Sequence, residues 1–596
     1  MDNFWNQDLN PEQQAAVTHG KGPVLILAGA GSGKTRALTY RTAYLIKEKG
    51  VSPDKILLVT FTNKAAKEMQ TRIKQLVGGG QMPLSGTFHS LGAKLLRADG
   101  ETIGVSQKFL IYDEADSLDT IKKAITQLNF DPKLVKPAAV KAVISQAKNE
   151  LIGWQEYRQF CRGEWQEKTA IIFQEYQRLL KLYQALDFDD LLTESVRLLK
   201  NNPAILNQYR EKWEYILVDE YQDTNRAQYE LTKMLASKWR NLCAVGDFSQ
   251  SIYSWRGADL RNLNNLKTDY PDLKTINLEQ NYRSTENILD AANKVISKNT
   301  MHPILTLWTK AGKGEKVKIL GVRDEKQEAE IITNIIKKGD EALSDFAILY
   351  RTNAQSRVVE EALIKAQIPY ILVGGTRFYS RKEVKDCLAY LRFLANGKDA
   401  ISYQRMANVG KKRLDKFLDW QNKHQEKIES MTTKEILNET LKATDYLALF
   451  DEKDEQDLMR IENIKELNSV AEEFNNLEEF LENVALVEAS ELANRRRKIK
   501  DAVTLMTLHA SKGLEFKVVF MVGMEEGLFP HARSIMDRAE LEEERRLCYV
   551  GMTRAKEKLY MSYADRRLYF GSFMSNGVSR FLGDIDENLL ELIHVG

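Results

Sequence analysis

Residues 24–35 read VLILAGAGSGKT: an apolar run of strand type, a glycine-rich loop, and a lysine and threonine that open a helical pattern. Glycines in such a loop leave backbone N–H groups free to converge on phosphate oxygens, and the following helix adds its N-terminal dipole. The pattern predicts a nucleotide-phosphate loop in which Lys34 reaches the β- and γ-phosphates and the Thr35 hydroxyl binds Mg²⁺. Ala28 is the one departure, because the pattern GxxxxGK[ST] has glycine at that position.

A second strand-type run, ILVDEYQD at 216–223, ends in two adjacent acids. Nucleotide hydrolysis needs a carboxylate that binds the metal and a group that accepts a proton from the attacking water. We therefore expect Asp219 to hold Mg²⁺ and Glu220 to act as the general base. Adjacent acids at a strand end also occur in surface turns, and the phosphate loop is what favours the catalytic interpretation.

The spacing of these two motifs indicates how the chain is organised. Lys34 and Asp219 are 219 − 34 = 185 positions apart, whereas a βα unit needs only about 30 residues. A helical insertion therefore separates them, and the same alternation of β/α and helical patterns recurs in the second half. We expect two α/β cores with parallel sheets, each split by a mainly α-helical insertion: core one at 1–88 and 204–277, its insertion at 89–203, core two at 278–380 and 501–596, and a shortened insertion at 381–500.

Composition excludes several classes of protein. The 596 residues carry 86 basic and 84 acidic side chains, a net charge of +2, so a polyanion would have to bind a local basic stripe rather than a diffuse polycation. The four cysteines are scattered singly, which argues against a disulfide framework or a zinc site. The N-terminal MDNFWNQDLN has no signal-peptide pattern and no apolar run approaches the roughly 18 residues of a membrane span, so we expect a cytoplasmic protein without membrane contact.

Further motifs occur in a fixed order along the chain: LNPEQ at 9–13, FTNKAAKEM at 61–69, GTFHSLG at 86–92, LDFDDLL at 186–192, VGDFSQSIYSWRGA at 245–258, LEQNYRS at 278–284, TLMTLHASKGLEF at 504–516 and EEERRLCYVGMTRAK at 542–556. Together with the two motifs above, this set resembles the UvrD, PcrA and Rep group of superfamily 1A DNA helicases over nearly the whole chain. The resemblance implies two RecA-like cores of the P-loop NTPase class.

For the nucleotide, the resemblance implies ATP with Mg²⁺. Gln13 would recognise the adenine edge, Arg36 and Tyr282 would stack on the base, Glu515 would accept from the ribose, and Gln250 would sense the γ-phosphate. Arg283 and Arg554, both from the second α/β half, would act as arginine fingers on the transferred phosphoryl group. The remaining nucleotide-binding positions are those of the phosphate loop and one glycine: Ala28, Gly29, Ala30, Gly31, Ser32, Gly33, Lys34, Thr35 and Gly513.

For the nucleic acid, the resemblance implies a track for single-stranded DNA. Such tracks combine phosphate contacts with aromatic faces on which bases stack. The motif SIYSWRG brings two aromatic residues and an arginine close to the nucleotide-sensing Gln250. The predicted DNA contacts are Phe61, Thr62, Asn63, His89, Tyr253, Trp255, Arg256, Arg351 and His509.

Three functional hypotheses remain open from the sequence. The first is an ATP-dependent 3′ to 5′ DNA helicase and single-stranded DNA translocase in repair or replication, which works on single strands and single-strand/duplex junctions. The second is a translocase that mainly removes bound proteins and unwinds duplex weakly, because the insertion at 381–500 is short for the group. The third is a nucleotide-gated binding protein that does not hydrolyse ATP.

Further expectations concern the residues before Gln250, and the location and oligomeric state of the protein. Phe248 and Ser249 stand where the family usually has an acidic residue before the glutamine, which puts the details of γ-phosphate coupling in question. We expect a protein of the bacterial nucleoid that is a monomer in isolation, with a dimer on DNA and repair or replication proteins as partners left open.

Overall fold

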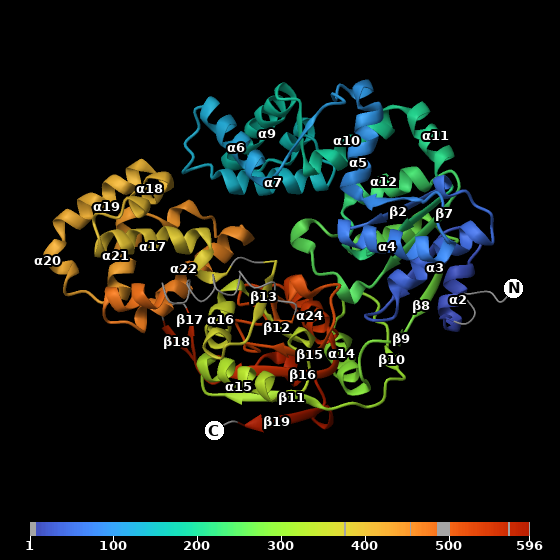
Figure 1. Cartoon of the computed structure of the whole chain (residues 1–596). Coiled ribbons are helices and arrows are strands. Elements are labelled where there is room, and N and C mark those ends of the chain that lie inside the picture. Colours follow the sequence, from blue (N-terminus) through green and yellow to red (C-terminus); the bar gives the residue numbers. More distant parts are fainter. Residues whose placement is uncertain (1–7, 375–376, 453, 485–500, 570–571, 595–596) are drawn as a thin grey trace. The chain divides into compact units, whose positions relative to one another are not determined.

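The structure is a computed structural model that describes residues 8–374, 377–452, 454–484, 501–569 and 572–594. The chain forms two compact units, one comprising residues 1–282 with 302–308 and the other 283–301 with 309–596 (Figure 1). No helix among the ranges given above is long and apolar enough to cross a membrane.

The first unit is built on a six-stranded sheet in the order β3-β2-β6-β7-β1-β8, and all of its strand pairs are parallel. Short β-rich runs separated by helices favour this arrangement, because a parallel neighbour needs a crossover connection. Its strands are β1 (Val24–Ala28), β2 (Ile56–Thr60), β3 (Leu84–Thr87), β6 (Tyr215–Val218), β7 (Asn241–Gly246) and β8 (Lys274–Leu278).

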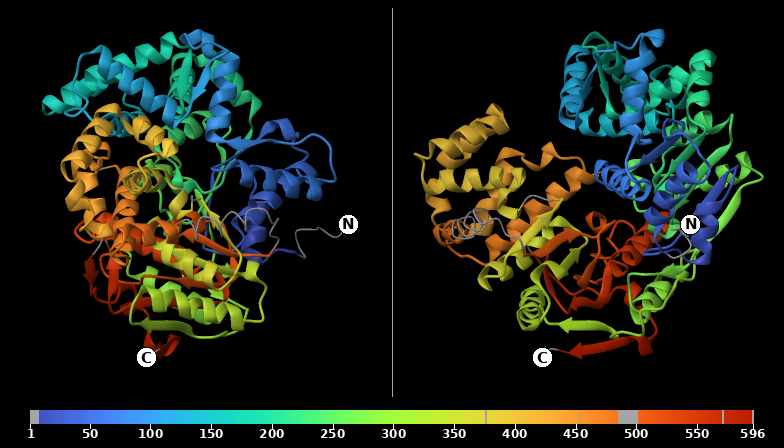
Figure 2. Two further views of the ribbon diagram at one scale, coloured as in Figure 1. Left: turned by 60° about the vertical axis from the view of Figure 1, so that its left-hand side comes forward. Right: turned by 45° about the vertical axis from the view of Figure 1, so that its right-hand side comes forward.

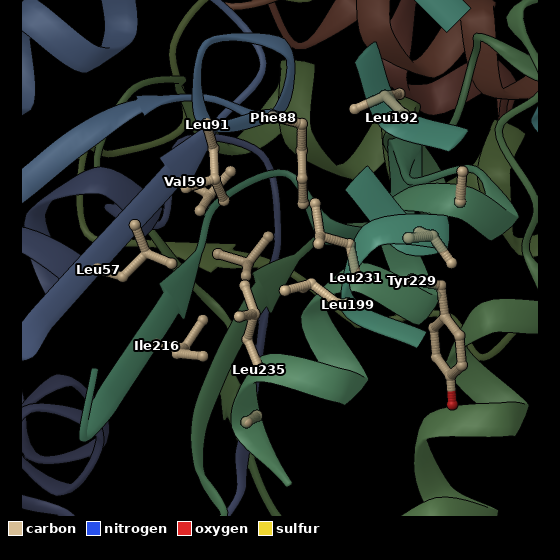
Figure 3. Packing of buried hydrophobic residues seen from close by; sticks show 14 of the residues in the cluster. Leu57, Val59, Phe88, Leu91, Leu192, Leu199, Ile216, Tyr229, Leu231 and Leu235 are labelled. Carbon is tan, nitrogen blue, oxygen red and sulfur yellow. The ribbon is translucent and has the colours of Figure 1, made fainter. Parts of the chain in front are cut away.

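Helices cover both faces of this sheet. Alternate strand residues divide between two cores: Leu58 and Leu217 pack with the helices α3 (Lys34–Lys47) and α4 (Asn63–Val77), whereas Leu57 and Ile216 face the opposite side. On that opposite side the partners come from α5 (Phe88–Asp99), α10 (Phe188–Asn201), α12 (Arg226–Ala236) and α13 (Arg261–Asp269). Figure 3 shows Leu231 and Leu235 of α12 directed at these strands. Strands buried on both faces explain the nearly continuous apolar runs in the sequence.

The segment between β3 and β6 is mainly helical, as the periodicity predicts. Besides α5 and α10 it contains α6 (Glu114–Gln127), α7 (Pro137–Asn149), α8 (Trp154–Tyr157), α9 (Glu164–Leu182) and α11 (Pro203–Lys212). It also contains two short parallel strands that the sequence analysis did not anticipate, β4 (Leu110–Tyr112) and β5 (Ala185–Asp187). A buried ammonium of α7 links β5 to α10: Lys148 Nζ lies 2.6 Å from Asp187 Oδ2 and 2.8 Å from Asp190 Oδ1.

The second unit contains a seven-stranded sheet in the order β13-β14-β12-β15-β16-β11-β19, again parallel throughout. Two parallel sheets with helices on their faces confirm the predicted α/β class. The strands are β11 (Val317–Val322), β12 (Phe346–Tyr350), β13 (Tyr370–Val373), β14 (Val503–Thr507), β15 (Phe516–Met521), β16 (Ala555–Ala564) and β19 (Leu590–His594). The helices around this sheet are α14 (Glu286–Ser297), α15 (Glu325–Lys338), α16 (Ser356–Lys365), α24 (Arg538–Met552) and α25 (Arg580–Gly583).

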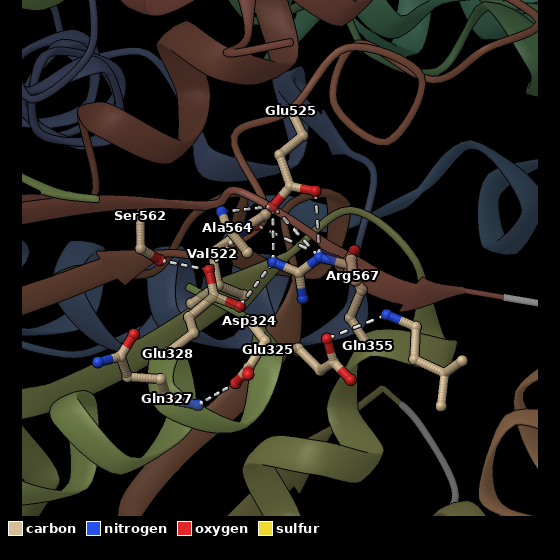
Figure 4. Close-up of polar contacts among 12 residues, drawn as sticks. Asp324, Glu325, Gln327, Glu328, Gln355, Val522, Glu525, Ser562, Ala564 and Arg567 are labelled. Carbon is tan, nitrogen blue, oxygen red and sulfur yellow. Dashed lines mark hydrogen bonds and ion pairs between the residues drawn. The ribbon is translucent and has the colours of Figure 1, made fainter. Parts of the chain in front are cut away.

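A buried ion cluster ties α15 to the far end of the chain. Arg567, at the start of the hairpin β17 (Arg567–Tyr569) and β18 (Ser572–Met574), lies 2.8 Å from Glu328 and 2.7 Å from Glu525 (Figure 4). The Ser562 hydroxyl donates to Glu328 Oε1 at 2.7 Å. Buried charges are stable only when paired and hydrogen-bonded, and this cluster meets that condition for its arginine.

The second insertion is helical over its described part. It contains α17 (Lys382–Ala395), α18 (Ala400–Val409), α19 (Lys411–Lys423), α20 (Gln425–Ile428), α21 (Thr433–Thr444) and α22 (Glu455–Glu472). Its own aromatic core includes Tyr390, Phe417 and Trp420, which are buried. Figure 2 shows these yellow and orange helices as a group of their own beside the strands of the second sheet. Residues 485–500 of the predicted insertion lie outside the described residues.

Candidate nucleotide and DNA site

The predicted site residues of the first unit gather at one edge of its sheet. The phosphate loop follows β1, Asp219 and Glu220 follow β6, and Gln250 follows β7. These three strands are neighbours in the order β6-β7-β1, so their carboxyl ends meet. In parallel sheets ligands bind outside the carboxyl ends of the strands. The fold thus brings together the three motifs that the sequence places far apart.

The phosphate loop has the backbone geometry that its glycines allow. Gly31 and Gly33 have φ of 66° and 87°, in the left-handed region that favours glycine, and Gly33 caps the N-terminus of α3. A Cβ at Gly29 would overlap the Leu307 side chain, and a Cβ at Gly33 would lie 2.9 Å from Gln13 Nε2. Ala28 is fully buried in the apolar core that includes Ala37 and Leu38 of α3, so its methyl group packs among apolar side chains at the position where the pattern has glycine.

Lys34 is the residue whose surroundings best fit an anion. Its Nζ is buried and has no hydrogen-bond partner among the described residues, and the nearest carboxylate oxygen, Glu220 Oε2, lies 3.9 Å away. A buried ammonium without hydrogen bonds is costly, and a phosphate oxygen would supply them. The side chain therefore fits the predicted role at the β- and γ-phosphates.

The segment around Tyr282 holds the phosphate loop from the other side. Asn281 Nδ2 donates to Ala30 O at 2.7 Å, and Tyr282 N donates to Gly31 O at 3.0 Å. Gln13 Nε2 donates to Ser32 O at 2.9 Å. These three bonds fix loop carbonyls, and Gly29 N and Ser32 N donate within the protein, to Leu278 O and Gly29 O at 3.2 Å each.

The predicted base-binding residues are exposed. Tyr282 is 51% exposed, and its hydroxyl donates to Gln280 Oε1 at 3.1 Å. Arg36 is also exposed; its guanidinium lies over the Tyr40 ring at 5.5 Å from the centroid. Gln13, in contrast, is buried, and its Oε1 accepts from Asn10 N. Both ends of this amide are thus engaged within the protein.

A chain of hydrogen bonds connects the acidic motif at 216–223 to the turn that follows β7. Glu220 has φ of 50°, an uncommon left-handed conformation for a residue with a side chain. Gln222 Nε2 donates to Glu220 Oε2 at 2.5 Å, and Gln222 Oε1 accepts from Asp247 N at 3.0 Å. Gln250 Nε2 donates to Asp247 Oδ2 at 2.6 Å. The general-base candidate and the γ-phosphate sensor are therefore linked through Gln222 and Asp247, two residues that the sequence analysis did not single out.

The donor set fits Mg²⁺ together with a nucleotide. Asp219 is buried at the end of β6, and Thr35 stands in the first turn of α3. Mg²⁺ prefers oxygen ligands and commonly takes one or two protein groups plus phosphates and waters. Within the described residues no group of three acidic, histidine or cysteine side chains could hold a metal by itself.

The predicted DNA contacts of the first unit follow β2, β3 and β7. Thr62 caps α4 by accepting from Ala65 N, and Phe61 packs edge-on against Phe88. His89 lies in the first turn of α5, and burial lowers its pKa. Tyr253 and Trp255 are in T-shaped contact at 6.3 Å, and Trp255 is 42% exposed. The side chain of Arg256 lies outside the described part of the structure.

An exposed aromatic residue beside these positions was missed. Phe188, at the start of α10, is 46% exposed and makes a T-shaped contact with His89 at 5.7 Å. The motif LDFDDLL contained it, but a phenylalanine in an amphipathic helix is usually a core residue, so only its exposure singles it out.

In the second unit two predicted nucleotide residues contact each other. Arg283 Nε donates to Glu515 Oε2 at 2.8 Å, and Lys556 Nζ lies 2.7 Å from Glu515 Oε1. Partial burial alone would raise the pKa of Glu515, but the hydrogen bonds from Lys556 and Arg283 outweigh it and lower the pKa. The Arg554 guanidinium is buried and donates to Val550 O and Leu514 O at 2.9 and 3.1 Å. Gly513, beside this group, has φ of 83°.

The two predicted DNA residues of the second unit lie at the ends of adjacent strands. Arg351 follows β12, and His509 follows β14, which pairs with β12. Arg351 is ion-paired with the buried Glu544 of α24, so its charge is neutralised within the protein.

Two family models together match most of the chain. The UvrD/REP helicase N-terminal domain matches residues 9–271, and the UvrD-like helicase C-terminal domain matches 276–433 and 407–566. This chain belongs to the UvrD-like helicase family. Among relatives in this family, the ATP-dependent DNA helicase PcrA of Bacillus subtilis is 44% identical over 98% of this chain and 86% of its own length. The proteins of the same name from Staphylococcus epidermidis and Staphylococcus aureus are 44% and 43% identical, each over 98% of this chain and 87% of their own length.

Proposed function

We propose that this UvrD-family chain is an ATP-dependent DNA helicase that moves 3′ to 5′ along single-stranded DNA in repair or replication. The orphaned, buried Lys34 ammonium within a glycine loop is the observation that carries the ATP assignment. The DNA substrate is supported by the family and by relatives named ATP-dependent DNA helicase. The polarity and the cellular role rest on resemblance alone.

The proposed reaction uses the chain's own residues in distinct roles. The loop N–H groups and Lys34 bind the phosphates, and Glu220 accepts the proton of the attacking water. Asp219 and Thr35 would hold Mg²⁺, which supplies charge neutralisation for the departing phosphates. Arg283 and Arg554 complete the set by supplying positive charge to the transferred phosphoryl group.

The proposed DNA track begins at the residues that follow β2 and β3 and includes the loop of Tyr253 and Trp255. Aromatic faces would stack on bases without reading their sequence. The partners are single strands and single-strand/duplex junctions, and the cytoplasm of a bacterial cell is the proposed location. Contacts of Arg351 and His509 extend the DNA-binding set to the second unit.

The second candidate is a translocase that mainly clears proteins from single strands and unwinds duplex weakly. The observation that favours it is the short second insertion. Displacement of streptavidin from biotinylated single strands and unwinding of 3′-tailed duplexes by the purified chain separate the two candidates. Efficient unwinding supports the helicase, whereas displacement without unwinding supports the second candidate.

ATP hydrolysis with and without single-stranded DNA, together with unwinding of 3′- and 5′-tailed duplexes, tests the proposal as a whole. We expect hydrolysis to be stimulated by single-stranded DNA and unwinding to require the 3′ tail. Hydrolysis that DNA does not stimulate would contradict the motor, and unwinding only from a 5′ tail would contradict the polarity.

A further inference from the structure

We infer that Gln222 is a positioning residue that couples the catalytic carboxylate to the γ-phosphate sensor. The inference rests on the proposed function and deepens it. Gln222 lies between two groups with predicted roles: its Nε2 is 2.5 Å from Glu220 Oε2, and its Oε1 accepts from Asp247 N at 3.0 Å. Asp247 in turn accepts from Gln250 Nε2 at 2.6 Å. One side chain thus joins the end of β6 to the end of β7.

The orientation of this amide follows from its partners. A backbone N–H only donates, so the atom of Gln222 that faces Asp247 N must be the oxygen. The amide nitrogen then faces Glu220, whose carboxylate only accepts when it is ionised. Hydrogen bonds to a charged carboxylate are short and roughly twice as strong as neutral ones. The contact therefore holds the Glu220 carboxylate in one orientation.

The Gln222 side chain is buried and tightly packed. Its exposed fraction is 1%, and a Cβ at the neighbouring Gly246 would lie 2.6 Å from Gln222 Oε1. Glycine at the end of β7 is therefore what lets this amide reach the backbone of Asp247. The Ser251 hydroxyl also donates to Gln222 O at 3.3 Å, so the main chain of Gln222 contacts the same loop.

The link continues toward the proposed DNA contacts. Asp247 Oδ1 accepts from Ser249 N at 3.0 Å while Oδ2 holds Gln250, so this one carboxylate organises the turn Phe248–Gln250. Tyr253 follows three positions after Gln250. A change in Glu220 on hydrolysis would thus reach the loop of Tyr253 and Trp255 through Gln222 and Asp247. The turn therefore forms although Ser249 stands where the family usually has an acidic residue, because the backbone N–H of Ser249 donates to Asp247.

Two substitutions distinguish the two hydrogen bonds that the Gln222 amide makes. Gln222→Glu keeps an oxygen that accepts from Asp247 N but removes the donor to Glu220. Gln222→Met has a similar length and removes both bonds. Gln127→Met, at an exposed position of α6, is the matched control. For each full-length chain we would measure ATP hydrolysis with oligo(dT), its KM for ATP, the thermal midpoint, and single-strand affinity with and without a non-hydrolysable ATP analogue.

We expect kcat to fall about tenfold to a hundredfold in both Gln222 variants, the range for loss of one hydrogen bond to a charged group. KM for ATP should stay within about threefold, because Lys34 and the loop are unchanged. The change in DNA affinity on adding the ATP analogue should shrink in both Gln222 variants, because each loses the hydrogen bond to Glu220. A merely structural role would instead lower the thermal midpoint and leave this nucleotide-dependent change in affinity intact.

Wild-type kcat in either Gln222 variant, or a nucleotide-dependent DNA affinity that survives in Gln222→Met, would overturn the inference. A wild-type chain whose hydrolysis DNA does not stimulate would instead overturn the proposed function on which it rests. The two failures are distinguishable because the second is seen without any substitution.

Discussion

Arg351 and Glu544 form an ion pair in which two guanidinium nitrogens meet one carboxylate oxygen: Arg351 Nε lies 2.8 Å from Glu544 Oε1, and Nη2 lies 2.7 Å from the same oxygen. Both side chains are largely buried, with 14% and 5% of their surface exposed. A residue predicted to contact DNA is thus held by an internal carboxylate, which a DNA phosphate would have to replace.

Substitution of Glu544 should therefore strengthen DNA binding. Glu544→Gln removes the negative charge but keeps an acceptor for His531 N, so the fold is retained. We expect the single-strand affinity to rise about threefold to tenfold and the log–log salt slope to steepen by about 0.7, the value for one further phosphate contact. Fluorescence anisotropy over a salt series measures both, with the exposed Glu540→Gln on the same helix as control. Equal slopes in all chains would show that Arg351 does not contact phosphate.

Loss of the Lys34 ammonium should remove ATP turnover. Lys34→Ala takes away the one buried cation of the phosphate loop, and we expect kcat to fall below about 1% of the wild-type value, as for removal of transition-state charge stabilisation. A phosphate-release assay with oligo(dT) measures it. Lys47→Ala, at the exposed end of the same helix, should leave kcat unchanged. DNA-stimulated hydrolysis retained in Lys34→Ala would refute the assigned role.

The contact of Gly29 with Leu307 predicts a pair of compensating substitutions. Gly29→Ala would place a methyl group against the Leu307 side chain, displacing the phosphate loop and weakening ATP binding. Leu307→Ala should make room for that methyl group, so the double variant should recover part of the lost affinity. Titration with a fluorescent ATP analogue measures all three chains. Additive losses in the double variant would argue against a steric cause.

The exposed Trp255 should contribute to single-strand binding. Trp255→Ala should weaken oligo(dT) binding by about 1–3 kcal/mol, the value for loss of one stacked base. Trp239→Ala is a suitable control because Trp239 is similarly exposed, at 37% against 42%. Fluorescence anisotropy at constant salt compares them. If both substitutions had the same effect, the assignment of Trp255 to the DNA track would fail.

Two buried carboxyls that share one ammonium should make stability depend on pH. Burial and the Asp187 charge raise the pKa of Asp190 to about 7, although Lys148 opposes them. The folded state then binds a proton that the unfolded state has lost, so stability falls as pH rises from about 4 to 7, by up to about 1.4 kcal/mol per pH unit. The pKa of Asp187 is lowered, so the stability that its ionised carboxylate contributes is lost only in acid, below the range of pH 4 to 7.

Asp190→Asn should therefore flatten this dependence. We expect the thermal midpoint of the wild-type chain to fall between pH 5.5 and 7.5 and that of the variant to change less. Asp119→Asn, at an exposed position of the same insertion, should follow the wild type. Parallel curves for all three chains would mean that Asp190 titrates at an ordinary pKa.

Much of the nucleotide site was predictable because its geometry is local. The residues from Ala28 to Thr35 are consecutive, and glycine conformations and a helix N-terminus alone determine how they face a phosphate. The same holds for Asp219 and Glu220 at a strand end. Two features were not predictable: the parallel strands β4 and β5, which are only three residues each, and the exposure of Phe188.

By itself, the sequence determined the class of fold, the phosphate loop, the acidic motif and the family, since these depend on short patterns and their order. The tertiary structure alone decided which distant side chains meet. Gln222 reaches Asp247 across 25 positions and Arg351 reaches Glu544 across 193. Such pairs depend on strand order and helix packing, and no local propensity encodes them, because the free energy that joins them is gained only when the sheet has formed.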